Sequence, residues 1–594
     1  MLNRRRDLFR IAGAGLALGA VPAAAETQGA PSAPPQPNPA AFAPTATTAD
    51  IIVDTLIAWG VPVIFGMVGD GIGPLIEAIS VRQDKLRFIG IRHEEAAAFM
   101  ATGWAKHTGQ LGACIATTGP GAVHLLNGLY EAKMDSAPVI ALTGMTFHDL
   151  IGTRFMQDVD TVKLMEPVAL HNVAVTGPLH AIAAADQACR AAVGLRGVAH
   201  LTVPKDIQAM HLSEDKPSME YHGLRTSSAP QPLAVAPAPA VLQQAADLLN
   251  GGRRVAILVG QGALGARDEV QQVADRLAAP VAKALLGKAV LPDDSPFTTG
   301  GIGHLGTVPS KQAMAECDTL LILGSTMPWI DFYPKPGQAR AVQVDLVADR
   351  IGLRYPVEVP IIGDVKATLQ GLLPLLQAKP DRSFLQTAQS RMKDWNTLIA
   401  QVRATERTPL RPQMVIGALS DALADDAVIS LDCGANTHFA ARTLMLRPGQ
   451  RLTGTGLMAT MGPGLPYAIA AALAYPGRQS VAIVGDGGFA MLMAELTTAV
   501  KFGLPVKILL LKNNSLAEVR FEQTDLGYQK FAVDLSPIDF VAYAQACGAD
   551  GFRCAQPGEV RSAIEAALRS PKPAIIEAVV DPEERPAMPD QLRV

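Results

Sequence analysis

The chain has 594 residues, of which 49% are hydrophobic and 18% charged, and its 51 Lys and Arg against 55 Asp and Glu give a formal net charge of -4. This composition excludes a short peptide, a disordered tail and a small disulfide-stapled domain, and it leaves room for three or four domains of ~150 residues each. Without a basic excess, nucleic acid is not an expected partner. The cysteines form no C-x-x-C pair, so we expect neither a zinc ribbon nor a dithiol redox centre.

The first residues have the order of an export signal. A run of arginines precedes an apolar stretch over residues 11–20 and a small-residue cleavage site. This order predicts a signal peptide over residues 1–25, and its paired arginines resemble twin-arginine signals, so we expect a periplasmic protein. The apolar stretch is shorter than the ~20 residues that span a bilayer, so we expect no integral membrane span. Residues 26–48 are rich in Pro, Ala and Thr, which predicts a disordered linker.

After the linker, short aliphatic runs alternate with longer helical patterns. Alternation of this kind is typical of parallel sheets covered by helices on both faces. Pro-rich or polar breaks divide the chain into blocks of domain size. We therefore predict an α/β protein with three doubly wound parallel-sheet domains, over residues 49–215, 239–375 and 405–585.

The strongest chemical pattern joins an aspartate and an asparagine. Residues 480–484 read as a buried strand, the sequence GDGG around Asp486 turns into a helix, and Asn513 follows the next strand, 506–511. The carboxyl ends of neighbouring parallel strands are where open α/β sheets bind ligands, and glycines let a helix N-terminus approach a phosphate. Carboxylate and carboxamide oxygens are hard ligands that suit Mg²⁺ or Ca²⁺ carrying a diphosphate. A lone G-D-G would be an ordinary turn.

This arrangement resembles the thiamine-diphosphate enzymes, in the branch that contains acetolactate synthase and pyruvate oxidase. The resemblance extends over nearly the whole chain after the linker. It implies that Asp486, Asn513 and the carbonyl of Ser515 hold Mg²⁺, and that Met461 lies under the cofactor and bends it. The expected contacts with thiamine diphosphate are Gly434, Met461, Gly485, Asp486, Gly487, Gly488 and Asn513. The three predicted domains correspond to the pyrimidine-binding, central and diphosphate-binding domains of that family.

An acidic residue of the first domain supplies the other half of the expected site. Glu94 precedes a helix start of small residues, where a carboxyl group can lie in apolar surroundings. From the residues alone an exposed helix-cap acid is the better interpretation. The resemblance implies that Glu94 contacts the aminopyrimidine ring and activates the cofactor, and that Gln157 and Glu522 are candidate substrate contacts, although an exposed helical acid explains Glu522 equally well.

The middle domain has glycines at several predicted strand ends, which suits a dinucleotide lying on the sheet. No G-x-G-x-x-G motif stands in the right context. The segment from Gly262 to Leu369 resembles bacterial pyruvate oxidase, which implies FAD with Gly324, Asp345 and Asp364 as candidate contacts. Many relatives leave this domain empty and use the glycines only as turns.

The resemblance implies decarboxylation of a small 2-oxo acid such as pyruvate. We expect an oxidative reaction through FAD to a quinone or another acceptor. The alternatives are an acetolactate synthase type of carboligase and an exported protein that binds thiamine diphosphate without turnover. Because family members build the site from two subunits, we expect a homodimer or homotetramer.

One stretch departs from the family pattern. Relatives usually carry Gly at the position of Ala517 and an apolar residue at the position of Glu518. A charge there would change the contacts with substrate, and a buried charge would need a partner.

Overall fold

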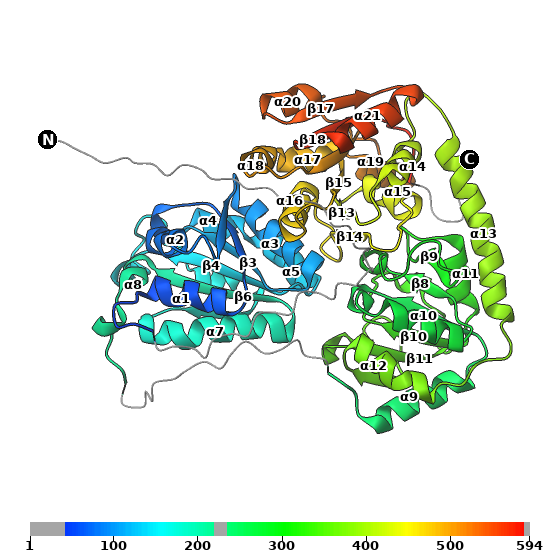
Figure 1. The fold of residues 1–594 in the computed structure, drawn as a ribbon, viewed down its shortest axis with the longest axis horizontal. Coiled ribbons are helices and arrows are strands. Elements are labelled where there is room, and N and C mark those ends of the chain that lie inside the picture. The colour runs from blue at the N-terminus through cyan, green and yellow to red at the C-terminus, as the bar shows by residue number, and fades with distance from the viewer. Residues whose placement is uncertain (1–41, 219–234, 587–594) are drawn as a thin grey trace, which may run out of the picture. The chain divides into compact units, whose positions relative to one another are not determined.

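The computed structural model describes residues 42–218 and 235–586. Within them the chain forms three six-stranded sheets whose neighbouring strands all run parallel (Figure 1). This confirms the predicted fold class. The predicted signal peptide, and the predicted linker as far as residue 41, lie outside the described residues. No helix in the described ranges is long and apolar enough to cross a membrane.

The first sheet has the strand order β2-β1-β3-β4-β6-β5. Its strands are β1 (Val63–Gly66), β2 (Arg87–Gly90), β3 (Gly112–Ala116), β4 (Val139–Met145), β5 (Ala169–Ala174) and β6 (Val198–Pro204). Its helices are α1 (Thr48–Ala58), α2 (Gly73–Ser80), α3 (Glu94–Thr108), α4 (Pro120–His124), α5 (Leu126–Met134), α6 (Thr161–Met165), α7 (Pro178–Leu195) and α8 (Lys205–Ala209). The side chain of Thr47 accepts the N–H of Asp50 and caps α1, so the predicted linker gives way to helix at Thr48.

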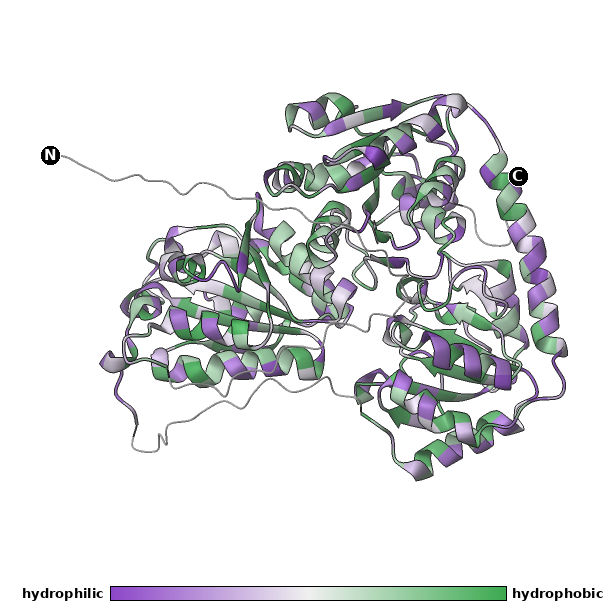
Figure 2. Ribbon diagram, in the orientation of Figure 1, coloured by the Kyte–Doolittle hydropathy of each residue, from purple (hydrophilic) through white to green (hydrophobic). Residues whose placement is uncertain are grey.

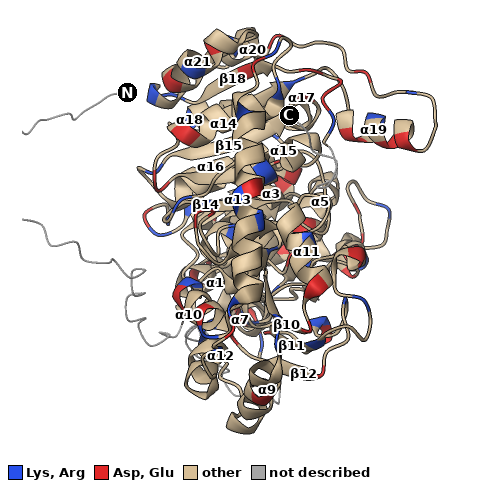
Figure 3. Cartoon of the chain, turned by 90° about the vertical axis from the view of Figure 1, so that its right-hand side faces the viewer, with Lys and Arg blue, Asp and Glu red and all other residues tan. Residues whose placement is uncertain are grey.

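The second sheet has the order β12-β11-β10-β7-β8-β9. Its strands are β7 (Val255–Val259), β8 (Val281–Lys283), β9 (Thr298–Gly301), β10 (Thr319–Leu323), β11 (Arg340–Asp345) and β12 (Val359–Ile362). Its helices are α9 (Pro239–Gly251), α10 (Arg267–Arg276), α11 (Val308–Glu316) and α12 (Val365–Leu372). The long helix α13 (Ser383–Ala404) follows, and it carries several basic residues and one acidic residue (Figure 3).

The third sheet has the order β14-β13-β15-β16-β18-β17. Its strands are β13 (Val428–Leu431), β14 (Arg451–Gly454), β15 (Ser480–Gly485), β16 (Lys507–Lys512), β17 (Asp550–Cys554) and β18 (Ala574–Val579). Its helices are α14 (Pro412–Ala422), α15 (Ala435–Thr443), α16 (Gly464–Ala474), α17 (Asp486–Met491), α18 (Leu496–Lys501), α19 (Ala517–Asp525), α20 (Phe540–Ala546) and α21 (Pro557–Arg569).

Both faces of each sheet are apolar, and the strands are mostly coloured as hydrophobic in Figure 2. Along β1, Val63 and Phe65 belong to one core cluster and Ile64 to another, because alternate side chains point to opposite faces. The first of these clusters also contains Ala482 and Val484 of β15. One continuous core therefore joins the first and third domains.

Small residues make the contact between α3 and α16 close. A Cβ added at Gly103 of α3 would lie 2.7 Å from the Tyr467 ring and 3.1 Å from the Tyr467 Cα. Tyr467 is fully buried at this contact. The small residues of α3 therefore let the two helices approach each other closely.

The segment after Asp486 differs from the single helix that the sequence predicts. The α17 helix ends at Met491, and a 3-10 turn over Met493–Glu495 precedes α18. This turn directs buried Glu495 toward the first domain, where its carboxylate accepts the backbone N–H groups of Arg92 and His93 at 2.9 and 3.1 Å. The break in the helix therefore serves a contact that local periodicity does not reveal.

Candidate functional site

The ends of β15 and β16 bring the predicted metal ligands together. These strands pair in parallel, so Asp486 and Asn513 emerge side by side from the sheet. The Asp486 Oδ2 atom accepts the backbone N–H of Asn513 at 3.1 Å and of Asn514 at 2.5 Å, and Oδ1 accepts that of Gly487 at 3.0 Å. The strand-turn-helix pattern in the sequence therefore yields the juxtaposition it predicts.

The donor atoms of this group fit a hard divalent cation. Burial raises the pKa of Asp486, while backbone N–H groups oppose that rise. Asn513 Oδ1 accepts the N–H of Ser515, and Ser515 Oγ is buried without a hydrogen-bond partner among the described residues. A carboxylate, a carboxamide oxygen and an orphaned hydroxyl at one point form an oxygen-rich set suited to Mg²⁺.

A cavity of about 80 Å³ lies against this group, and we call it the diphosphate cavity. The residues that line it include the third-domain cofactor contacts and the metal ligands expected from the sequence: Gly434, Met461, Gly485, Asp486, Gly487, Gly488, Asn513 and Ser515. All of its lining residues come from position 412 onward. Within one chain the cavity is thus built by the third domain alone.

Asp432, which is not among the predicted site residues, supports this cavity. Its buried carboxylate accepts the N–H groups of Cys433, Gly462 and Gly464 at 2.8, 3.0 and 2.9 Å. Burial raises the pKa of Asp432 to about 6, against these hydrogen bonds. A Cβ at Gly488 would lie 2.5 Å from Asp432 Oδ1, so the cavity glycine is needed for close packing. The sequence feature that could have identified Asp432 is its position directly after strand β13.

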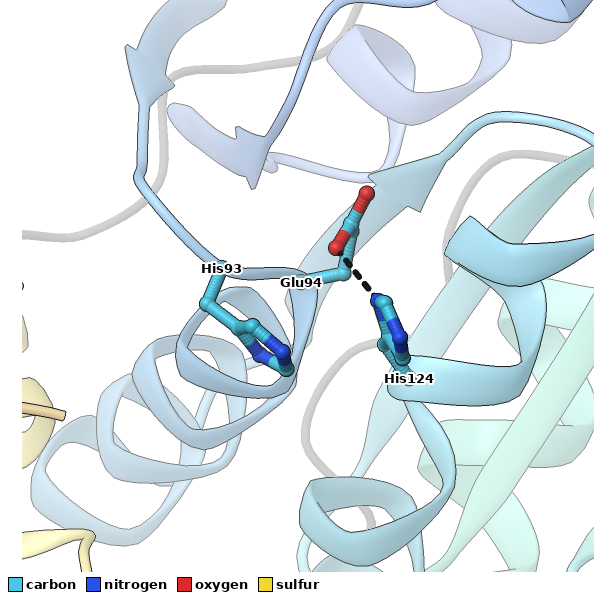
Figure 4. A group of neighbouring side chains, drawn as sticks. All are labelled: His93, Glu94 and His124. Atoms are coloured by element: carbon cyan, nitrogen blue, oxygen red, sulfur yellow. Dashed lines mark hydrogen bonds and ion pairs between the residues drawn. The ribbon is translucent and has the colours of Figure 1, made fainter. Parts of the chain in front are cut away.

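Glu94 is the first residue of α3 and is buried, with a side chain only 9% exposed. Its Oε2 atom lies 2.9 Å from Nδ1 of His124, at the end of α4 (Figure 4). The His124 ring stacks on that of His93 with centroids 4.6 Å apart. Glu94 Oε1 lies beside Gly121, where a Cβ would approach it to 3.3 Å. Glu94 is among the predicted catalytic residues, whereas its partner His124 is not.

Glu94 does not line the diphosphate cavity of its own chain. Neither do the other two predicted catalytic residues. Gln157 is exposed, in a loop with left-handed backbone (φ 61°), and its Cβ faces Gly119. Glu522 is exposed on α19. The predicted catalytic and diphosphate-binding groups thus remain apart within a single chain.

A second, larger cavity of about 530 Å³ lies along the middle domain, and we call it the central cavity. Of the three residues expected to contact FAD, Gly324 and Asp345 line it, whereas Asp364 does not. The Asp364 carboxylate accepts the N–H of Ala367 and caps α12, so the aspartate that was expected to contact a dinucleotide is a helix cap.

The backbone of the central cavity is crowded at its glycines. A Cβ at Gly260 would lie 2.2 Å from the carbonyl oxygen of Gly324, and one at Gly262 would lie 2.8 Å from the Gly324 Cα. Gly324 itself has a φ of 56°. Two strand ends therefore meet with bare backbone on the cavity wall, which is a surface that an extended ligand can approach closely.

A buried charge cluster joins all three domains beside this cavity. Lys106 Nζ lies 2.6 Å from Glu131 and 2.5 Å from Asp135, and it also donates to the carbonyl of Gly454 at 2.7 Å. The carbonyl of Asp135 accepts the side chain of Gln261 from the middle domain at 2.6 Å. Burial raises the pKa of Glu131, whereas Lys106 helps to hold the pKa of Asp135 below its usual range against the effect of burial.

Known families match all three parts of the chain. The N-terminal thiamine pyrophosphate binding domain matches residues 46–164, the central domain of thiamine pyrophosphate enzymes matches 242–372, and their C-terminal thiamine pyrophosphate binding domain matches 432–578. Thiamine pyrophosphate is another name for thiamine diphosphate. The diphosphate cavity lies in the last of these regions.

Similar proteins cover almost the whole chain. The Bacillus subtilis protein YdaP, named as thiamine pyrophosphate-containing, is 36% identical over 92% of this chain and 93% of its own length. A pyruvate oxidase of Lactiplantibacillus plantarum is 29% identical over 91% and 90%, and an acetolactate synthase of Mycobacterium bovis is 31% identical over 90% and 88%. Together with the three matching domains, these likenesses show that the chain belongs to the thiamine pyrophosphate enzymes, in the branch that includes pyruvate oxidase and acetolactate synthase.

Proposed function

We propose that this protein decarboxylates a small 2-oxo acid with thiamine diphosphate and Mg²⁺ and passes the released electrons through FAD to a quinone or another acceptor. The observation that carries the oxidative part is the adjacency of the two cavities, because Cys433 and Gly434 line both. Two cofactors bound in them would lie close enough to exchange electrons.

The third domain would hold the cofactor through its metal. Asp486 and Asn513 offer side-chain oxygens and Ser515 its carbonyl, while Gly487 and Gly488 keep the start of α17 free of side chains. When bound, thiamine diphosphate supplies an electron sink for cleavage of the bond between the keto carbon and the carboxylate.

Glu94 is the proton-handling group of the first domain in this proposal. Its carboxyl is buried at the start of α3, and His124 orients one of its oxygens. The other oxygen, Oε1, lies beside Gly121, which presents no side chain of its own to a ring nitrogen that approaches. The carboxyl would hold the proton that this nitrogen takes up and returns.

The central cavity fits FAD in size and in lining. Its volume of about 530 Å³ lies within the range of cofactor sites, ~300–1,000 Å³. Arg196 and Arg350 line it and offer positive charge to a diphosphate group. Gly260 and Gly324 provide the bare backbone on which an extended dinucleotide can lie.

The spectrum of the purified holoenzyme tests this proposal. We expect a flavin absorbance that pyruvate or another small 2-oxo acid bleaches under anaerobic conditions. Colourless protein that converts pyruvate to acetolactate would replace the oxidase by the carboligase, a reading favoured by the acetolactate synthase relative. If the protein retains thiamine diphosphate but consumes no 2-oxo acid, it is a thiamine diphosphate-binding protein without turnover. Glu518, which stands where relatives usually carry an apolar residue, favours this alternative.

Two further parts of the proposal concern assembly and location. We propose a homodimer or homotetramer, supported by the separation of Glu94 from the diphosphate cavity within one chain. We also propose twin-arginine export to the periplasm, supported by the order of residues 1–25 in the sequence.

A further inference from the structure

An acid and an imidazole face each other where the two cavities adjoin. Glu518 lies in the first turn of α19 and lines the diphosphate cavity, while His438 lies on α15 and lines the central cavity. Their facing atoms, Glu518 Oε2 and His438 Nδ1, are 3.4 Å apart. The pair therefore stands in the wall between the cavities.

Both facing atoms are sealed from solvent. Neither Glu518 Oε2 nor His438 Nδ1 has a hydrogen-bond partner among the described residues, and both are buried. A buried polar atom without a partner is costly and needs an explanation. The separation is slightly too long for a good hydrogen bond and would close with a small side-chain rotation.

We propose that Glu518 and His438 form a proton path between the diphosphate cavity and the central cavity. The inference rests on the proposed oxidation of a 2-oxo acid. That reaction converts the 2-oxo acid and one water into the shorter carboxylate and CO₂, and it releases two electrons and two protons. The electrons pass toward the central cavity, and the path lets a proton follow them.

The transfer balances at named atoms. The Glu518 carboxyl gives its proton at Oε2 to the lone pair of His438 Nδ1, while the imidazole releases the proton on Nε2 to water in the central cavity. The resulting carboxylate regains a proton released in the diphosphate cavity. The imidazole then returns to its first tautomer through rotation or exchange with water, so the pair undergoes no net change in a cycle.

The charges around the pair favour this starting state. Burial raises the pKa of Glu518 to about 7, with Glu522 acting in the same direction and Arg442 and Arg585 opposing. Burial also lowers the pKa of His438 to about 4, assisted by Arg442 and His304 and opposed by the Gly434 backbone. Between about pH 4 and pH 7 a largely protonated carboxyl therefore faces a largely neutral imidazole, the state in which the acid can donate.

Spectroscopy of the intact holoenzyme tests the shared proton without turnover. Infrared difference spectra across a pH titration should show, besides a band from Asp432 that ionises near pH 6, a carboxylic acid band that ionises near pH 7 and is missing in Glu518→Gln. Replacement of His438 by Gln should shift the midpoint of that band. Glu565→Gln, which alters a half-buried acid on α21, is the matched control and should leave the band intact. A Glu518 carboxyl that is already ionised at pH 5 would overturn the proposal.

Kinetics test the path itself. We expect Glu518→Gln and His438→Gln each to slow reduction of the bound acceptor by the 2-oxo acid about 100-fold, with the double variant no slower than either single variant. The proposed path would be wrong if the rate losses of the two single variants multiplied in the double variant, or if both single variants reduced the acceptor at the wild-type rate. If the wild type binds no thiamine diphosphate and consumes no 2-oxo acid, the proposed function fails and the path with it, whereas loss of the path alone leaves the wild-type reaction in place.

Discussion

At the scale of single residues, the sequence predicts the roles that depend on local pattern. It does not predict the roles that depend on contacts between distant parts of the chain. Asp486 and Asn513 were predictable because each directly follows a strand of one βαβ unit, and parallel pairing brings strand ends together. The role of Glu495 was not predictable, because its carboxylate accepts the backbone N–H groups of Arg92 and His93, which lie some 400 residues away in the sequence. An aspartate after a strand is also ambiguous: Asp364 follows β12 yet caps a helix.

The opposed titrations of Glu518 and His438 predict a dependence of stability on pH. The pKa of Glu518 is about 7 in the folded state instead of 4.5, so the folded state binds this proton more tightly than the unfolded state does. The resulting contribution to the free energy of unfolding is complete below pH 4.5 and is lost as the pH rises to about 7. His438 has its pKa lowered from 6.5 to about 4, so its contribution is present above pH 6.5 and is lost as the pH falls to about 4. The two trends oppose each other in the wild type.

Single variants should separate these trends. We expect the melting temperature of the wild type minus that of Glu518→Gln to decrease from pH 4.5 to pH 7. The same difference taken with His438→Gln should increase from pH 4 to pH 6.5. Differential scanning calorimetry at constant ionic strength measures both. Parallel curves for wild type and both variants would show that neither group titrates in these windows.

At the scale of elements, small residues set how closely helices approach. The sequence shows Ala and Gly in α3, but the partner α16 becomes evident only in the structure, because it lies in another domain. The break in the predicted helix after Asp486 also depends on another domain. The turn at Met493–Glu495 places Glu495 against backbone N–H groups of the first domain.

Gly103 provides a direct test of this packing. We expect Gly103→Ala to lower the free energy of unfolding by ~1–3 kcal/mol, because the added Cβ meets Tyr467 at both ring and backbone. Gly194 of α7 is the matched control, since a Cβ there has no atom within 4 Å and Gly194→Ala should not destabilise the protein. Equal stability of both variants in urea unfolding would mean that α3 and α16 adjust without cost.

At the scale of the whole molecule, the diphosphate cavity is complete in one chain and Glu94 stands outside it. The Glu495 contact fixes the segment before Glu94 on the third domain of the same chain. Because this segment is already held there, we propose that a Glu94 carboxyl that meets the cofactor comes from a second copy. A two-fold dimer would then contain two sites, each with Glu94 from one chain and Asp486 from the other.

Complementation distinguishes a shared site from one within a chain. Glu94→Gln and Asp486→Asn should each be inactive alone. Co-expressed in equal amounts, they should recover about a quarter of wild-type activity, because about half of the dimers are mixed and each of those has one intact site. Double-tag purification would confirm the mixed dimers.

The reverse pairing is the control. A Glu94→Gln, Asp486→Asn double variant co-expressed with wild-type chains should retain about a quarter of the activity if sites are shared, since a mixed dimer then has one defect in each site, and about half if each chain is complete. No recovery in the first mixture together with half activity in the second would place the whole reaction within a single chain.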